Sequence, residues 1–298
     1  MKKKSKRKTG RKPEPRKEKH KKKEVKKPVS FHEGIKNIFH LKERRRKTGE
    51  KRKEDTFIKT GIPGFDRLFE KGIPAGSSIL LAGGAGSGKT IMGLQILANS
   101  AHKGKKCLYM SFEESEERLR EHMSNFGWNP EELEKKGNLM IKRFSTFDVS
   151  RALDALLAKS RGELLIDVEP IILPDNFVPE IIVVDSLTAI ASAFAGREAY
   201  RSYIEHLFRY FENLRVNSFL ITETQQVPTI YSPTGVEEFL ADGVIVLYNV
   251  RKGDIRESAI EILKMRGSKH IKKVVAMQVV SGTGIEVYPE QEVFGEIK

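Results

Sequence analysis

Residues 78–102 have the sequence SILLAGGAGSGKTIMGLQILANSAH. The apolar run Ser78–Ala82 predicts a buried strand, and Thr90–His102 predicts a helix. Between them, GGAGSGKT at Gly83–Thr90 matches the complete G-x-x-x-x-G-K-[ST] pattern of a phosphate-binding P-loop. A strand before this pattern and a helix after it are the context that the pattern requires. The segment therefore predicts an ATP-binding protein with an α/β fold.

The residue types in this P-loop follow from what it must bind. Glycines let the backbone wrap around phosphate groups with the N–H groups pointing inward, and the helix that follows adds the positive end of its dipole. Lys89 can reach the β- and γ-phosphates, and the Thr90 hydroxyl can bind Mg²⁺. The predicted nucleotide-binding residues of the loop are Gly83, Gly84, Ala85, Gly86, Ser87, Gly88, Lys89 and Thr90.

Two acidic motifs are expected to lie near the P-loop. IIVVDS at Ile181–Ser186 predicts a buried strand with Asp185 at its carboxyl end, where it can hold Mg²⁺ or a water bound to it. SFEES places Glu113 and Glu114 after the strand that follows the P-loop helix, where a carboxylate can polarise an attacking water. The spacing alone equally allows two solvated acids at a helix start, where they suit the dipole.

The order of apolar and amphipathic segments predicts a mainly parallel, twisted sheet with helices on both faces. After about Gly243 three strand-like segments follow with short turns, which predicts an antiparallel β extension at one edge of the sheet. Residues 163–180 contain prolines and predict an irregular inserted loop. The other expected strands are Cys107–Phe112, Leu139–Phe144, Phe219–Thr224, Val244–Val250, Ser258–Met265 and Lys273–Tyr288, and the expected helices are Phe65–Phe69, 116–126 with Ser115 as its cap, Ala152–Lys159 and Glu198–Asn217.

The positive charge is concentrated at the amino end. Residues 1–55 carry 25 of the 54 Lys and Arg residues but 8 of the 40 acidic residues, so the rest of the chain is close to neutral. We expect residues 1–54 to form a disordered tail and residues 55–298 to form the folded domain. Residues 31–42 of the tail form either a short amphipathic helix or a marginal helix in solvent. The tail is suited to contact nucleic acid or another polyanion.

The cysteine count and the apolar stretches indicate a compartment. Cys107 is the single cysteine, so no intramolecular disulfide can form, and a reducing, cytoplasmic compartment is expected. The amino terminus lacks the apolar region of a secretory signal. The longest apolar stretch, Ile181–Ala195, is interrupted by polar residues and is too short to span a bilayer, so no transmembrane segment is expected.

Several separated motifs together resemble the KaiC-like branch of the RecA-type ATPases, in its single-domain, archaeal-type form. The resemblance covers roughly residues 56–290. It implies a RecA-like fold, Mg²⁺-dependent ATP hydrolysis and a ring-forming homo-oligomer, with a hexamer as one candidate, that binds nucleotide at its subunit interfaces. The motifs are TGIPGFDRLFEKGIPAGS (60–77), GGAGSGKT, SFEES, IIVVDS, FLITET (219–224), GVEEFLADGVIVL (235–247) and KMRGSKH (264–270).

The resemblance also implies roles for single residues. Glu113 and Glu114 match the catalytic glutamates of the family. Lys264 and Arg266 match basic residues that act across the subunit interface on the γ-phosphate bound by the neighbour, where an arginine can stabilise transition-state charge. The alternative for these two is a pair of exposed basic residues near an edge strand. The clock protein of this family carries two such domains, and no counterpart of its phosphorylation segment is found here, so autokinase activity is not expected.

Three functions remain open on the sequence. The first is an ATPase that works as a ring. The second is an ATP-gated binding or assembly switch with negligible hydrolysis, because function does not follow from fold. The third is a nucleic-acid-associated ATPase of the RecA type that uses the basic tail, although the tail lacks the interleaved aromatic residues that stack on single strands.

Overall fold

The structure is a computed structural model that describes residues 56–160, 169–174, 177–252 and 254–293. The expected basic tail, with its candidate helix at 31–42, lies outside the described residues. Of the expected irregular loop at 163–180, residues 169–174 and 177–180 are described, and they contain neither helix nor strand. No helix in the described parts of the chain is both long and apolar enough to cross a membrane.

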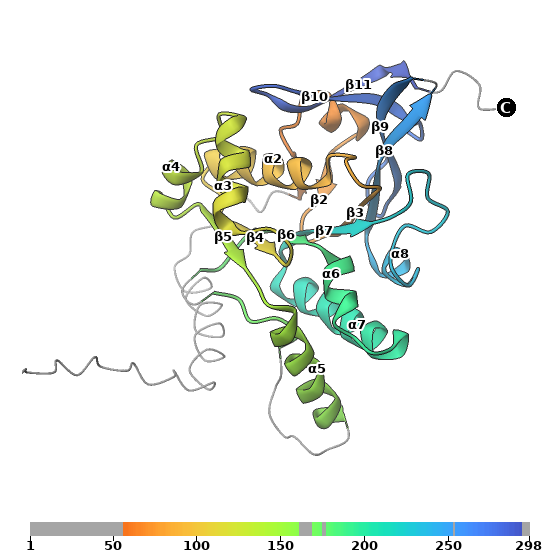
Figure 1. The fold of residues 1–298 in the computed structure, drawn as a ribbon. Helices are drawn as coiled ribbons and strands as arrows, with labels where there is room; N and C mark the ends of the chain where they lie inside the picture. The colour runs from red at the N-terminus through yellow and green to blue at the C-terminus, as the bar shows by residue number, and fades with distance from the viewer. Residues whose placement is uncertain (1–55, 161–168, 175–176, 253, 294–298) are drawn as a thin grey trace, which may run out of the picture. The chain divides into compact units, whose positions relative to one another are not determined.

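A nine-stranded sheet with the order β11-β10-β9-β8-β3-β7-β6-β4-β5 organises the fold (Figure 1). The strands from β8 through β5 in this order run parallel, and β8 to β11 pair antiparallel. This arrangement confirms the predicted RecA-like α/β fold with an antiparallel extension. The strands are β3 (Ser78–Gly83), β4 (Cys107–Ser111), β5 (Leu139–Arg143), β6 (Ile181–Asp185), β7 (Asn217–Glu223), β8 (Gly243–Lys252), β9 (Ile255–Met265), β10 (Val275–Val280) and β11 (Gly284–Glu292), while β1 (Phe57–Ile58) and β2 (Ile73–Pro74) form a separate pair.

Helices cover both faces of the parallel part of the sheet (Figure 1). In β3, Ile79 and Leu81 belong to the core that contains α2, whereas Leu80 between them belongs to the core that contains α7. Since both faces are covered, the strands are apolar at nearly every position. One face carries α2 (Lys89–His102), α3 (Glu116–Asn125) and α4 (Pro130–Lys135), and the other carries α5 (Thr146–Ser160), α6 (Leu187–Ser192) and α7 (Arg197–Leu214).

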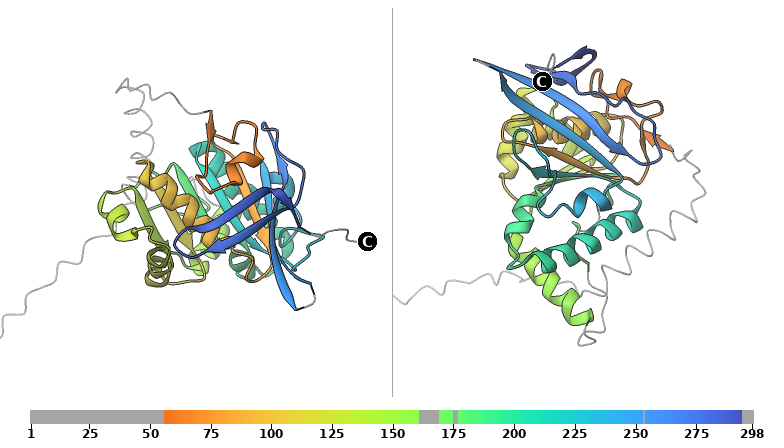
Figure 2. Two further views of the ribbon diagram at one scale, coloured as in Figure 1. Left: turned by 90° about the horizontal axis from the view of Figure 1, so that it is seen from above. Right: turned by 90° about the vertical axis from the view of Figure 1, so that its right-hand side faces the viewer.

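The hairpin of β10 and β11 lies over α2 (Figure 2). The buried Gln95 of α2 fixes it, because its amide donates to Ile285 O and Thr283 O, each at 3.2 Å, and accepts from Ile285 N at 2.7 Å. Met277 and Ile285 complete the apolar core on this side of the helix. The antiparallel part of the sheet therefore contacts the P-loop helix and holds it in place.

Several short elements differ from the expectations. The single expected segment Lys273–Tyr288 is divided into β10 and β11 by a turn in which Gly282 has φ +76°. The expected helix at 65–69 is a 3₁₀ helix, η1 (Phe65–Leu68), and the helix expected at 152–159 begins already at Thr146. The helices α4, α6 and α8 (Glu237–Leu240) were not predicted, because one or two turns are too short to show a helical periodicity.

Candidate nucleotide site

The candidate site lies at the carboxyl rim of the parallel strands, which is the edge where these strands end. Gly83 at the end of β3 pairs with Glu223 at the end of β7. Ser111 at the end of β4 pairs with Asp185 at the end of β6. Because all four strands are parallel, these ends meet at one edge. The sheet thereby brings the P-loop, the SFEES turn and Asp185 together.

The P-loop forms a cradle that has no room for larger side chains. A Cβ atom at Gly83 would lie 2.4 Å from Leu247 O, and one at Gly84 would lie 2.8 Å from Gln226 Cδ. Gly88 caps α2 with φ 95°, a left-handed conformation that favours glycine. The first N–H groups of α2 have no partner within the helix and face the loop, which suits a phosphate group.

Lys89 is folded back into this cradle. Its ammonium group donates to Gly83 O at 2.9 Å and to Gly84 O at 3.0 Å, and the residue is 8% exposed. Burial lowers the pKa of Lys89, while the charges of Glu223, Asp185 and Glu113 oppose that shift. The cation is therefore held at the loop by neutral carbonyls, in a position to meet phosphate oxygens.

Asp185 is the buried acid of the site. Its Oδ2 accepts hydrogen bonds from Thr90 Oγ1 at 2.9 Å and from the Tyr109 hydroxyl at 2.5 Å. Burial raises the pKa of Asp185, and the hydrogen bonds from Tyr109 and Thr90 oppose the rise. Burial, followed by the charge of Asp185, likewise raises the pKa of Tyr109.

The oxygens at this point fit Mg²⁺. The Thr90 hydroxyl and the Asp185 carboxylate lie side by side, and Mg²⁺ in nucleotide sites takes one or two protein oxygens together with phosphate oxygens and water. The buried Ser87 Oγ has no hydrogen-bond partner within the described structure, as expected of a group that faces a ligand. No cluster of three or more His, Cys, Asp or Glu side chains able to hold a metal occurs in the part that the structure describes.

The two glutamates of SFEES point to different partners. Glu113 Oε1 accepts a hydrogen bond from the Ser186 hydroxyl, directly after Asp185. Glu114 instead pairs with Arg118 on α3, with 3.1 Å between Oε2 and Nε, and lies 3.7 Å from His122 Nε2. The structure therefore directs Glu113 to the nucleotide site and Glu114 along α3.

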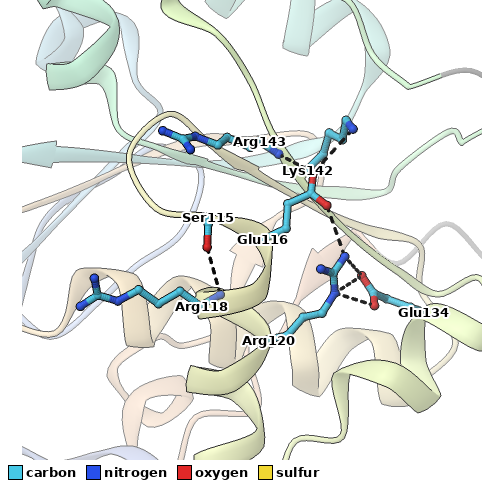
Figure 3. Close-up of polar contacts among 7 residues, drawn as sticks. All are labelled: Ser115, Glu116, Arg118, Arg120, Glu134, Lys142 and Arg143. Carbon is cyan, nitrogen blue, oxygen red and sulfur yellow. Dashed lines mark hydrogen bonds and ion pairs between the residues drawn. The ribbon is translucent and has the colours of Figure 1, made fainter.

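A polar network holds the turn that carries these glutamates (Figure 3). Ser115 caps α3 by accepting from Arg118 N at 3.3 Å, as predicted. Glu116 accepts from Arg143 N at 3.1 Å, which joins the start of α3 to the end of β5. Arg120 binds both carboxylate oxygens of Glu134, which joins α3 to α4. The start of α3 is thus fixed against the sheet.

Lys264 and Arg266 lie at the opposite edge, the amino rim. Lys264 pairs with Val244 near the start of β8, whereas the P-loop residue Gly83 pairs with Leu247 further along the same strand. Because a strand rises about 3.3 Å per residue, the backbones of Lys264 and Gly83 lie on the order of 10 Å apart along it. Their side chains also turn to the amino rim, so the structure does not bring them to the P-loop of their own chain.

Backbone carbonyls of α8 and of Ala241 directly after it hold both cations. Lys264 Nζ donates to Glu238 O at 2.9 Å and to Ala241 O at 2.6 Å. Arg266 donates to Phe239 O at 2.8 Å and to Leu240 O at 3.4 Å, and its ion pair with Asp242 is longer, at 3.6 Å. These contacts are mainly with neutral carbonyls.

Four site residues were missed by the sequence reasoning. The Tyr109 hydroxyl donates to Asp185, and the Ser186 hydroxyl donates to Glu113. Two side-chain amides contact the P-loop: Gln226 Nε2 donates to Ala85 O at 3.1 Å, and Asn249 Nδ2 donates to Gly86 O at 3.2 Å. Only Ser186 has a sequence signal, because it follows the acid directly. The other three reach the site through the folding of separate strands and loops.

Comparison with known families decides the classification. The family described as "ATPase: KaiC" matches residues 58–292. This chain belongs to the KaiC ATPase family. The match spans the P-loop, the carboxyl rim and the two basic residues at the amino rim, so the KaiC domain includes every site element described above.

Relatives of the KaiC family support the assignment. "Circadian clock protein KaiC3" of Synechocystis sp. strain PCC 6803 is 33% identical over 232 residues, covering 78% of this chain and 45% of the relative. "Circadian clock oscillator protein KaiC 1" of the same organism is 30% identical over 243 residues, covering 78% of this chain and 44% of the relative. The chain therefore spans about half the length of these relatives.

A solved structure of similar size resembles the fold. The KaiC-like protein PH0186 of Pyrococcus horikoshii OT3 superimposes with a TM-score of 0.64 and 32% sequence identity. The similarity covers 78% of this chain and 99% of that protein. The single KaiC domain of the present chain thus has a single-domain counterpart.

Proposed function

We propose that this protein is a Mg²⁺-dependent ATPase that hydrolyses ATP between copies of itself in a ring. One observation carries the proposal. The P-loop, Glu113 and Asp185 meet at the carboxyl rim of the sheet, while Lys264 and Arg266 are held at the amino rim of the same sheet. A head-to-tail ring places the amino rim of one copy against the carboxyl rim of the next.

Each side chain has a defined task in this proposal. Lys89 binds the β- and γ-phosphates, and Glu113 orients and polarises the attacking water. Thr90 and Asp185 hold Mg²⁺, which neutralises charge on the phosphates when it is bound. Glu114, the second glutamate of the resemblance, acts less directly, because Arg118 engages its carboxylate.

The neighbouring copy supplies the remaining charge. Lys264 and Arg266 make their shortest contacts with neutral backbone carbonyls, and the ion pair of Arg266 with Asp242 is longer, at 3.6 Å. An anion presented by another copy, such as the γ-phosphate of its ATP, would balance their positive charge. Phe239 is 78% exposed beside Arg266, and an apolar side chain there can be buried by the adjoining copy.

ATP turnover tests the proposal. Lys89→Ala should abolish phosphate release, whereas the matched control Lys103→Ala, at the exposed end of α2, should keep the wild-type rate. The mass of the assembly, measured with and without Mg-ATP, should correspond to several copies of the chain, as a ring requires. Equal phosphate release by wild type and Lys89→Ala would overturn the proposal, and tight ATP retention without turnover would favour the assembly switch.

The compartment and the tail are proposed on the sequence alone. The single cysteine suits a reducing, cytoplasmic compartment. The basic residues 1–54 are proposed to contact nucleic acid or another polyanion, and they lie outside the described residues. A chain that starts at Asp55 and keeps full affinity for DNA would show that the tail does not carry such binding.

A further inference from the structure

The motif GVEEFLADG contains a buried acid to which the proposed function gives no task. Glu237 in this motif is 0% exposed, although it belongs to the single-turn helix α8. An isolated turn of helix is not stable in water, so side-chain contacts must hold it in place. Its Oε2 accepts a hydrogen bond from Thr234 Oγ1 at 2.8 Å, and no ion pair compensates it within the described chain.

The other oxygen of Glu237 is buried where α8 packs against α7. Glu237 Oε1 and the hydroxyl of Tyr200 on α7 are both buried, and neither has a hydrogen-bond partner in the described structure. Burial, followed by the charge of Glu237, raises the pKa of Tyr200. A buried carboxyl is costly to leave without partners, so the hydrogen bond from Thr234 and the packing of α8 on α7 stabilise this position of Glu237.

The next residue fixes the loop that leads into α8. Glu238 Oε1 accepts from Tyr231 N at 2.5 Å and from Ser232 Oγ at 3.2 Å. The side chains of both glutamates therefore bind groups of the same chain. The carbonyls of residues 238–241 bind the cations of Lys264 and Arg266.

We propose that Glu237 is a positioning residue that acts through α8 on Lys264 and Arg266. With Oε2 bound to Thr234 and Oε1 buried where α8 packs against α7, it fixes the four carbonyls that hold the two long cationic side chains. The inference rests on the proposed function, in which these cations serve the nucleotide of the next copy. In this proposal the motif GVEEFLADG forms the support for the cations of KMRGSKH.

The support has a defined physical benefit. Lys and Arg side chains lose considerable rotamer freedom when they are ordered. If α8 orders them before the neighbour binds, that cost does not fall on the transition state. Loss of the support should therefore lower the turnover rate at saturating ATP and leave ATP affinity nearly unchanged, because the P-loop lies at the other rim.

Subunit mixing separates this role from a simple effect on folding. Glu237→Ala should lower turnover at saturating ATP by at least about tenfold, with the KM for ATP changed less than about twofold. Lys89→Ala cannot turn over ATP itself but has an intact α8. Mixing the two variants should restore part of the turnover, because the Glu237→Ala copy supplies the P-loop and the Lys89→Ala copy supplies the two cations. The exposed Glu198→Gln on α7 is the matched control and should behave as wild type.

The outcomes distinguish the proposed nucleotide site between two copies from the positioning role of Glu237. Arg266→Ala mixed with Lys89→Ala is the reference mixture, and a return of ATP turnover in it supports a site shared by two copies. The positioning role alone would be overturned if the Arg266→Ala mixture recovers activity and the Glu237→Ala mixture does not. It would also be overturned if Glu237→Ala by itself turns over ATP within about twofold of the wild-type rate. No recovery in the reference mixture would overturn the shared site and the positioning role with it.

Two milder variants guard against misfolding. Glu237→Gln keeps one acceptor oxygen and should lose less turnover than Glu237→Ala. Tyr200→Phe removes the hydroxyl that faces Glu237 and should also lower turnover while ATP binding persists. If both folded variants keep the wild-type rate, the positioning role is overturned without any use of the alanine variant.

Discussion

The two rims of the sheet are built in different ways. At the carboxyl rim, contiguous motifs supply the P-loop, Glu113 and Asp185, and parallel strands bring them to one edge. At the amino rim, Lys264 and Arg266 are held by a single helical turn that packs against α7. The first rim is determined mainly by local sequence, and the second depends on long-range packing.

The rims also differ in how they balance charge. Lys89 at the carboxyl rim is surrounded by the charges of Glu223, Asp185 and Glu113. Lys264 at the amino rim is held by carbonyls; burial and then the charge of Arg266 lower its pKa, and the charges of Asp242 and Glu238 oppose that shift. The carboxyl rim therefore gathers three acids around one cation, and the amino rim places two cations beside two acids. Such complementary charges favour contact between unlike rims of two copies.

Among the variants that leave the P-loop unchanged, the largest effect is expected at the amino rim. Arg266→Ala should lower ATP turnover by about 10³-fold, because an arginine supplied across an interface stabilises transition-state charge. ATP binding should remain, since the P-loop is untouched. Arg256→Ala on the same strand, where the side chain contacts Asn249 O, is the matched control. Turnover of Arg266→Ala within tenfold of wild type would break the proposed division of the site between rims.

A smaller effect is expected from Glu113, the proposed general base at the carboxyl rim. Glu113→Gln should lower turnover by about 10²-fold, which is typical for loss of a general base. Glu114→Gln should lose clearly less, because Arg118 engages that carboxylate. The exposed Glu117→Gln serves as control, and phosphate release at saturating ATP is the measurement. A larger loss for Glu114→Gln than for Glu113→Gln would reverse the assigned roles.

The shape of the P-loop predicts a more moderate change. Gly84→Ala would place a Cβ 2.8 Å from Gln226 Cδ and fill part of the cradle. We expect ATP affinity to fall by about tenfold, equivalent to about 1.4 kcal/mol. Gly196→Ala is the control, because a Cβ there meets nothing within 4 Å. Titration with a fluorescent ATP analogue measures the affinity, and equal affinities for both variants would contradict the cradle.

The smallest effect concerns the stability of the carboxyl rim without metal. Burial raises the pKa of Asp185 above its ordinary value of 3.8, so the folded protein binds the proton more tightly than the unfolded chain. The free energy of unfolding therefore falls as the pH rises from 3.8 through the raised pKa of Asp185. Asp185→Asn should escape this loss and melt a few °C higher than wild type at pH 7 in chelator.

The pH dependence makes that last prediction specific. The difference in Tm between Asp185→Asn and wild type should grow as pH rises through the raised pKa and should be smallest at acidic pH. Melting curves over a pH series, recorded in chelator, measure it. A difference that is the same at every pH would show that packing, and not the buried charge, sets the stability of this position.

Most of the fold could be predicted from the sequence because both faces of the parallel strands are buried. The strands at 78–83, 107–111 and 181–185 are apolar at nearly every position, and turn residues bound them. The short helices α4, α6 and α8 could not be predicted, since four to six residues carry no clear periodicity. Neither could the division of residues 273–288 into two strands.

The site was predictable only where it is local. The P-loop carries its own pattern, and Asp185 ends a recognisable strand. Tyr109, Gln226 and Asn249 contact the site through tertiary folding, so no local signal marks them. The different directions of Glu113 and Glu114 depend on how α3 is held against β5, which spacing in the sequence does not specify.

Activity in a mixture of two inactive variants tests the shared site most directly. Lys89→Ala lacks the P-loop cation and Arg266→Ala lacks the cation of the amino rim, so each should be nearly inactive alone. In an equimolar mixture, roughly a quarter of the interfaces of a ring would combine an intact P-loop with an intact Arg266. We predict that ATP turnover returns to about that fraction of the wild-type rate. A mixture that stays as inactive as its components, while still assembling, would contradict the account.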